Sequence, residues 1–167
     1  MRVFREVQKF RQWWFILIII ATTCVVFYGL FEEYKEVEKE SSTDLITFIV
    51  SALFALLVIA IIFIFKLETK INEQGIYYGF WPFQLKLKHV PWSEIKKIYV
   101  REYSPISEYG GWGYRFSFGK HGKAYNVSGS TGIQIIFKNG KKTLIGTQKK
   151  EEVESVLKTY QHKLLHT

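Results

Sequence analysis

Two long apolar stretches dominate the pattern of hydrophobic and polar positions along the chain. Residues 45–65 contain no charged side chain, and residues 13–31 are almost as apolar. A helix of about 21 residues spans about 32 Å, which is close to the roughly 30 Å hydrocarbon core of a bilayer. The pattern therefore predicts two transmembrane helices, 13–31 and 45–65, that form an antiparallel hairpin.

The segments that flank these stretches differ in charge. Residues 1–12 are basic, the connector 32–44 holds six acidic residues against two lysines, and the block 66–167 holds 17 Lys and Arg against 8 acidic residues. Positive residues beside a membrane span stay on the cytoplasmic side. The charges therefore predict a multi-pass protein of the inner (cytoplasmic) membrane, with both termini in the cytoplasm and an acidic external loop.

The basic N-terminus, residues 1–12, also carries apolar residues at helical spacing, among them Phe4 and Val7. Two interpretations are open. The segment either extends the first span into the cytoplasm as a helix or lies on anionic lipid as an amphipathic helix. Extension of the span is the favoured interpretation.

From residue 71 onward, the pattern changes to short alternating runs that Gly, Pro and Asn interrupt. Alternation of apolar and polar side chains is typical of half-buried strands. Asn139-Gly140 lies between two such runs, and this dipeptide predicts a β-hairpin. The pattern predicts seven strands, in the runs 75–80, 84–89, 98–103, 112–118, 123–127, 132–138 and 142–147.

A helix is expected to follow the last strand, with Thr147 as its N-cap. Its apolar residues recur at helical spacing and trace one stripe: Val153, Val156, Leu157, Tyr160 and Leu164. Seven short strands and one amphipathic helix predict a strongly bent antiparallel sheet whose open end the helix covers. Together with the two spans, this is a membrane-anchored α+β protein.

Particular segments of this block carry a resemblance to a known family. The segment 90–95 (VPWSEI) introduces the third strand, and the segments 108–115, 124–129 and 145–148 follow it. In this order, after two spans, they resemble the bacterial pleckstrin-homology-like membrane proteins, in a subgroup without an assigned activity. The resemblance covers about residues 66–165. It implies a seven-stranded, PH-like bent sheet or barrel with a C-terminal capping helix.

The sequence offers no signature of catalysis. It holds no HExxH, GxSxG, Walker or CxxC motif. The single cysteine, Cys24, excludes both a disulfide within the chain and a metal cluster of thiolates. The four histidines share no metal-ligand spacing. We therefore expect a non-enzymatic protein without catalytic residues, metal or cofactor.

The segment 103–115 is the first candidate for a binding site, because it combines aromatic residues, glycines and an arginine. Aromatic residues and arginine supply most of the binding energy of protein interfaces. Tyr109, Trp112 and Arg115 are the predicted contacts to a protein partner. The alternative is that Trp112 and Tyr114 fill the mouth of the barrel while the glycines only shape the chain.

Basic residues of the block 66–167 form the second candidate, in a chain whose net charge is +8. An anionic lipid surface attracts each nearby lysine by about 1 kcal/mol. Lys86, Lys88, Lys96 and Lys97 are the predicted lipid-surface residues. Nucleic acid is not an expected partner, because no motif for it is present. The other members of this basic surface are Arg101, Lys120, Lys123, Lys141 and Lys142.

These observations predict an integral membrane protein that presents a cytoplasmic PH-like interaction module to a protein partner or to the anionic leaflet. The alternative function is specific binding of a lipid or a small ligand by the same domain. Besides the lipid bilayer and the protein partner, a second copy of the chain is a possible partner, since small residues along the spans permit close helix packing.

Overall fold

The computed structural model describes residues 2–36, 42–117 and 120–165. The chain forms two compact units. Unit 1 combines the segment that ends at Lys9 with the segment that begins at Phe65, and unit 2 is the intervening segment Phe10–Ile64.

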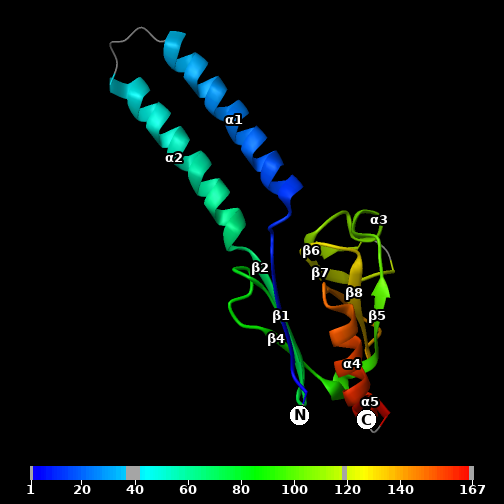
Figure 1. Ribbon diagram of the computed structural model, residues 1–167. Coiled ribbons are helices and arrows are strands. Elements are labelled where there is room, and N and C mark those ends of the chain that lie inside the picture. The colour runs from blue at the N-terminus through cyan, green and yellow to red at the C-terminus, as the bar shows by residue number, and fades with distance from the viewer. Residues whose placement is uncertain (1, 37–41, 118–119, 166–167) are drawn as a thin grey trace. The chain divides into compact units, whose positions relative to one another are not determined.

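Unit 2 consists of two helices, α1 (Trp13–Glu36) and α2 (Ser42–Ile64), which contact each other (Figure 1). Within α1, the Thr22 hydroxyl donates to the carbonyl of Ile18 at 2.9 Å, and the Thr23 hydroxyl donates to that of Ile19 at 2.6 Å. Bonds of this kind satisfy a hydroxyl within its own helix. The two threonines therefore leave α1 unbroken.

The prediction that these two segments cross a membrane is wrong: across the described residues, no helix has the length and the apolar character that a crossing requires. The C-terminal turns of α1 hold an ion pair between Glu32 and Lys35 at 3.0 Å, so charged residues occupy that end of the helix. This finding corrects the transmembrane hairpin, the membrane-anchored fold class and the multi-pass location in the inner membrane. Residues 37–41 of the predicted external loop lie outside the described residues.

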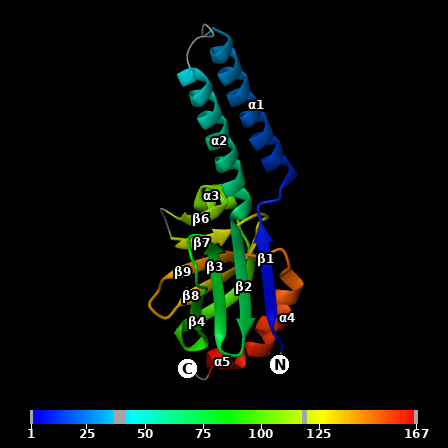
Figure 2. The same cartoon turned by 90° about the vertical axis from the view of Figure 1, so that its left-hand side faces the viewer.

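The first sheet of unit 1 is antiparallel throughout, with the strand order β1-β2-β3-β4 (Figure 2). Asn72 shapes the turn between β2 and β3, because its side-chain oxygen accepts hydrogen bonds from the backbone N–H groups of Gln74 and Gly75. β1 precedes unit 2 in the chain and β2 follows it, so this sheet joins the two segments of unit 1. The four strands are β1 (Phe4–Lys9), β2 (Lys66–Asn72), β3 (Gly75–Trp81) and β4 (Lys88–Pro91).

The second sheet of unit 1 has the order β5-β8-β9-β7-β6. β7 and β9 pair in parallel, and the other neighbours pair antiparallel. β8 and β9 flank Asn139-Gly140, which confirms the predicted hairpin. The strands are β5 (Ile95–Glu102), β6 (Gly113–Phe116), β7 (Lys123–Asn126), β8 (Thr131–Phe137) and β9 (Lys142–Gly146).

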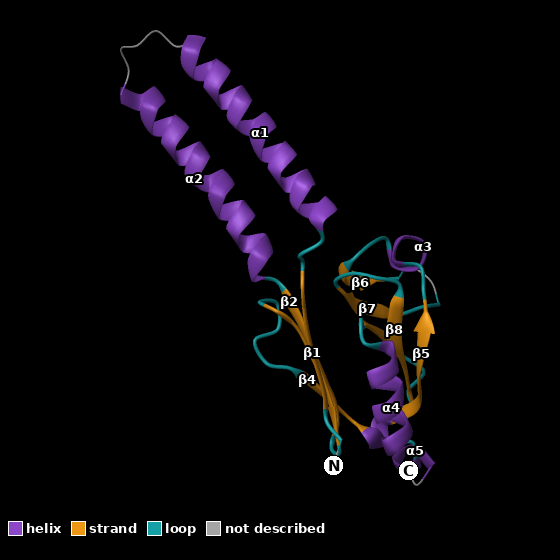
Figure 3. Cartoon of the chain, viewed as in Figure 1, coloured by secondary structure: helices purple, strands orange, loops and turns teal. Residues whose placement is uncertain are grey.

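Side chains from both sheets and from the helix α4 form the core of unit 1. Figure 3 shows the strands of the two sheets in orange and the helices in purple. Tyr78 of the first sheet meets Tyr125 of the second edge-on, with ring centroids 4.9 Å apart. Trp92 packs on Tyr160 of α4 at 5.4 Å and donates its indole N–H to the carbonyl of Asn72 at 3.1 Å. The helical elements of unit 1 are η1 (Trp92–Glu94), α3 (Pro105–Tyr109), α4 (Lys150–Tyr160) and α5 (His162–Leu165).

The predicted sheet of seven antiparallel strands is wrong in number and in direction. The described residues form nine strands in two sheets, and one pair of neighbours is parallel. Most of the predicted strand 84–89 is loop, because β4 begins only at Lys88. The C-terminal helix is confirmed as α4, although Lys149, rather than Thr147, is its N-cap residue.

The N-terminus forms the strand β1 where a helix was expected. Its buried and exposed side chains alternate strictly, with Phe4, Glu6 and Gln8 inside. β1 pairs with β2 along its whole length, and this pairing provides hydrogen-bond partners for backbone groups of β1. Two of its three buried side chains are polar, so the inward face of this strand does not read as apolar in the sequence.

Polar bonds tie β1 to the end of β9 in the second sheet. The carboxylate of Glu6, only 6% exposed, accepts hydrogen bonds from the Thr147 hydroxyl at 2.6 Å and from the backbone N–H of Gln148 at 2.9 Å. The Gln8 amide donates to the carbonyl of Gly146 at 2.8 Å. Hydrogen bonds to an ionised group are roughly twice as strong as neutral ones. Glu6 therefore adds a link between β1 and the second sheet to the β1–β2 pairing that joins the two segments.

We expect Thr147→Val to lower the free energy of unfolding by roughly 1–3 kcal/mol, because it leaves the buried Glu6 carboxylate without one of its donors. Valine keeps the shape of threonine, so packing is preserved. Thr159→Val on the exposed side of α4 is the matched control and should change stability by less than about 0.5 kcal/mol. Urea unfolding followed by circular dichroism measures both; equal stability of the two variants would contradict the role of Glu6.

Candidate functional site

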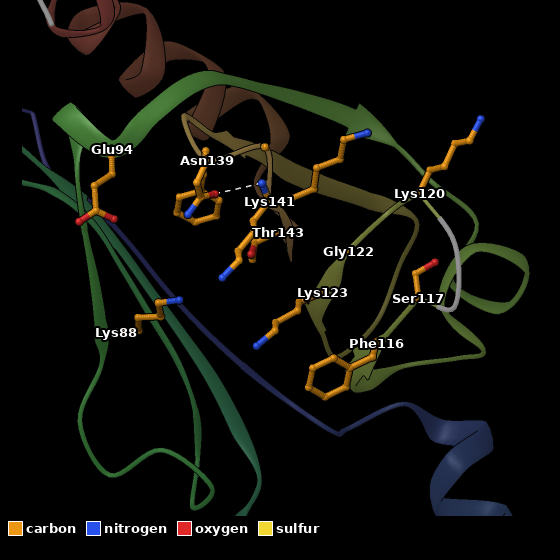
Figure 4. Close-up of a pocket in the computed structure, with 13 residues that line it drawn as sticks. Lys88, Glu94, Phe116, Ser117, Lys120, Gly122, Lys123, Asn139, Lys141 and Thr143 are labelled. Atoms are coloured by element: carbon orange, nitrogen blue, oxygen red, sulfur yellow. Dashed lines mark hydrogen bonds between the residues drawn. The ribbon is translucent and has the colours of Figure 1, made fainter.

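A pocket of about 740 Å³ lies in unit 1, between the first residue of β4, the described residues that follow β6 and precede β7, and the β8–β9 hairpin. Five of its lining residues are lysines, and its one acidic residue is Glu94 (Figure 4). We call it the lysine pocket. Its lysines are Lys88, Lys120, Lys123, Lys141 and Lys142.

The lysines reach the pocket from three separate segments of the chain. Figure 4 shows the ammonium groups of Lys88 and Lys123 directed toward the same open space, while the side chain of Lys120 points away from them. Among the described residues, no carboxylate lies within ion-pair distance of any of the five ammonium groups. Their positive charge is therefore not neutralised by the part of the protein that the structure describes.

Aromatic rings flank two of these lysines. The ammonium of Lys123 lies 5.0 Å from the ring centroid of Phe116, and that of Lys88 lies 5.8 Å from Phe137. A cation over an aromatic face gains about 0.5–1 kcal/mol at an exposed site. Phe137 is buried, whereas the side chain of Phe116 is 53% exposed. The pocket thus combines cationic groups with an accessible aromatic ring at its rim.

Parallel pairing of β7 with β9 brings the backbones of Lys123 and Lys142 to the same end of the sheet. Lys123 lies opposite Thr143 in this pairing, so Lys142 is the preceding residue on the neighbouring strand. Both Lys142 and Thr143 line the pocket. The register of this pair therefore concentrates positive charge at one end of the sheet.

Glycine allows the two chains to approach closely here. Gly122 has φ +78°, and a Cβ atom at this position would lie 2.3 Å from the carbonyl oxygen of Lys142. Any other residue would meet both backbone strain and a clash with backbone. On the other side, the Asn139 side chain accepts a hydrogen bond from the backbone N–H of Lys141 at 3.0 Å and so shapes the β8–β9 turn.

The predicted lipid-surface lysines separate in the structure. Lys88 lines the lysine pocket, and Lys86 is exposed in the loop before β4. Lys96 and Lys97 are exposed on β5, and the ammonium of Lys97 lies 5.1 Å from the ring of Tyr99. None of these last three lines the pocket. Their role at a lipid surface stays a prediction.

The predicted partner contacts are partly occupied within the protein. Tyr109 is only 4% exposed, and its hydroxyl donates to the carbonyl of His121 at 3.3 Å. The Trp112 indole donates to the carbonyl of Gly129 at 3.2 Å, and the Arg115 guanidinium donates to the carbonyl of Trp112 at 2.9 Å. Trp112 is half-buried and Arg115 is exposed. Their contact with a protein partner stays a prediction.

The helix α3 organises this segment. The Ser104 side chain caps its first turn by accepting from the N–H of Ser107, Pro105 occupies the first helical position, and Gly110 ends the helix with φ 71°. These local signals were present in the sequence as Ser-Pro and Gly, between the predicted strands 98–103 and 112–118.

An ion-pair cluster joins α3 to β5. Arg101 donates to both carboxylate oxygens of Glu108, at 3.1 and 2.6 Å, and the imidazole of His121 lies 3.2 Å from the same carboxylate. Hydrogen bonding from Arg101 lowers the pKa of Glu108, and the same interaction raises the pKa of Arg101. Arg101, unlike the pocket lysines, is therefore neutralised internally.

Sequence reasoning placed the five pocket lysines in a general basic surface but singled out only Lys88 among them. Their separation along the chain concealed their proximity. Gly122 permits the close approach of the two strands, but a single glycine is equally typical of a turn and did not indicate this pairing in the sequence. Among the described residues, no group of three or more His, Cys, Asp or Glu is placed to hold a metal ion.

We expect the stabilisation by Glu108 to depend on pH. Its pKa in the folded protein lies below the ordinary value of 4.5, so its contribution is complete above about pH 4.5 and is lost as the pH falls through the lowered pKa. Wild type should therefore be more stable than Glu108→Gln at neutral pH, and the difference should shrink in acid. Urea unfolding of both proteins from neutral pH to pH 3 measures this; a difference that stays constant would show that Arg101 does not act on the Glu108 charge.

Comparison with known proteins does not add to this geometry: no protein-family model, no curated protein and no solved structure matches the chain. The resemblance to bacterial pleckstrin-homology-like proteins therefore stays a prediction.

Proposed function

We propose that unit 1 is a non-enzymatic binding module whose lysine pocket holds a compact anionic ligand. The observation that carries this proposal is the excess of positive charge in a concave site: five lysines against one glutamate line the same pocket. Like charges gathered in a concavity focus their field and raise the local concentration of an oppositely charged ligand.

The size and the lining of the pocket support a ligand rather than a solvated surface. Small-molecule sites usually have volumes of about 300–1,000 Å³, and this pocket of about 740 Å³ falls within that range. Phe116 and Phe137 provide apolar surface, and the hydroxyl-bearing residues Ser117 and Thr143 also line it. Cationic, polar and aromatic groups thus surround one space.

This proposal develops the alternative that the sequence left open, namely specific binding of a small ligand. The segment 103–115 supports the protein-partner hypothesis less well, because its polar groups bond within the protein. Trp112 uses its indole N–H on Gly129, and Tyr109 is buried. A partner there would have only part of the expected contact surface.

A fluorescent polyanion without phosphate, pyrenetetrasulfonate, tests the proposed function on the whole chain. We expect saturable binding with one site per chain, detected by fluorescence anisotropy. Lys123→Gln/Lys142→Gln should weaken this binding by about tenfold or more, because each lost charged contact costs about 1.5–3 kcal/mol. Added salt should also weaken the binding, since four of the five lysines are exposed and the fifth is half-buried.

Lys96→Gln/Lys97→Gln is the matched control, because it removes the same charge from exposed lysines outside the pocket. This variant should bind the probe like wild type. An equal loss in both double variants would show that only the net charge matters, and the proposed function would then be rejected. Circular dichroism confirms that each variant is folded.

A further inference from the structure

The charge of the lysine pocket sets a requirement on its ligand. Lys120 points away from the shared space, so the other four lysines and one glutamate leave an excess of about three positive charges. A phosphate monoester carries about −1.5 to −2 charges near neutral pH. A single phosphate or carboxylate therefore cannot balance the pocket, whereas two or more phosphate groups on one ligand can.

The type of cation is compatible with phosphate. All five cationic residues are lysines, and no arginine lines the pocket. Lysine is a compact charge with three rotatable donors, and it commonly binds phosphate in proteins. The lysines can therefore accept phosphate oxygens, and competition by citrate distinguishes phosphate from carboxylate.

The arrangement of the lysines also favours a short, dense ligand over a polymer. Lys88 and Lys123 come from different sheets and point into the same space (Figure 4). Lys123 and Lys142 lie on neighbouring strands at its edge. A linear acidic peptide or a nucleic acid would need cations along a stripe, whereas Lys88 and Lys123 converge on one space.

We infer that the lysine pocket binds a phosphate chain, that is, two or more linked phosphate groups, either free or attached to a nucleoside. This inference rests on the proposed function and specifies its ligand class. The exposed ring of Phe116 lies at the rim, beside Lys123, where a base attached to the chain can stack.

Displacement of pyrenetetrasulfonate tests the inference, in buffer without divalent cations. The competitors are orthophosphate, pyrophosphate, tripolyphosphate, fructose bisphosphate and citrate. We expect tripolyphosphate and pyrophosphate to displace the probe at concentrations at least about tenfold below orthophosphate, because each added phosphate brings further charged contacts. Citrate tests whether negative charge without phosphate is sufficient for displacement. Fructose bisphosphate tests whether two phosphates that are not linked to each other are sufficient.

The outcomes separate this inference from the proposed function. If citrate or fructose bisphosphate competes as well as pyrophosphate, or if tripolyphosphate fails to displace a probe that does bind, the phosphate-chain inference is overturned while the proposed function stands. If the probe itself binds without saturation, both are overturned. Lys123→Gln/Lys142→Gln should lose affinity for tripolyphosphate by about tenfold or more, and Lys96→Gln/Lys97→Gln should keep it.

A comparison of adenosine triphosphate with tripolyphosphate identifies the source of the chain. Tighter binding of the nucleotide that disappears in Phe116→Ala assigns the site to nucleotides, since base stacking on an aromatic ring is worth about 1–3 kcal/mol. Equal binding of the two, unaffected by Phe116→Ala, assigns it to the free chain. Both results support the inference. If wild type binds the nucleotide at least tenfold more weakly than tripolyphosphate, the nucleoside source is overturned and the free chain is the ligand.

Discussion

The parallel pairing of β7 with β9 is the constraint on which the second sheet and its pocket depend. It buries Ala124 and Leu144 against each other's strands and extends the β5-β8-β9 sheet to β6. The same pairing brings Lys123 and Lys142 to one end of the sheet, where both residues line the pocket. Gly122 makes this approach possible, because a side chain there would clash with the carbonyl of Lys142.

The cationic side chains of unit 1 fall into two groups, those paired with a carboxylate and those without such a partner among the described residues. Arg101 is satisfied by Glu108, and this pair fixes α3 onto β5. The pocket lysines have no such carboxylate among the described residues, and aromatic rings support two of them instead. An ion pair within the protein contributes to stability, and its positive charge is then no longer available to bind a ligand. Cations held together without counter-charges remain available to a ligand.

Local sequence signals predicted several elements well. Asn139-Gly140 between two alternating runs identified the β8–β9 hairpin, and the apolar stripe from Val153 to Tyr160 identified α4. The prediction of secondary structure failed where pairing with a distant segment determines the conformation. β1 was expected to be helical, because Phe4 and Val7 fit helical spacing, but its pairing with β2 makes it a strand. Its buried Glu6 finds donors at Thr147 and Gln148, residues more than a hundred positions away.

The two apolar stretches are a second case in which a prediction from the sequence was wrong. Composition alone indicated two spans, whereas the helices of the described residues do not meet the requirement for crossing a membrane. By itself, the sequence determined the elements that nearest neighbours stabilise, namely a tight turn, a helix stripe and a basic C-terminal block. Only the tertiary structure decided which strands pair and which of nine basic residues share a pocket. Strand pairing is a contact between distant segments, and the spacing of charges along a chain carries no information about it.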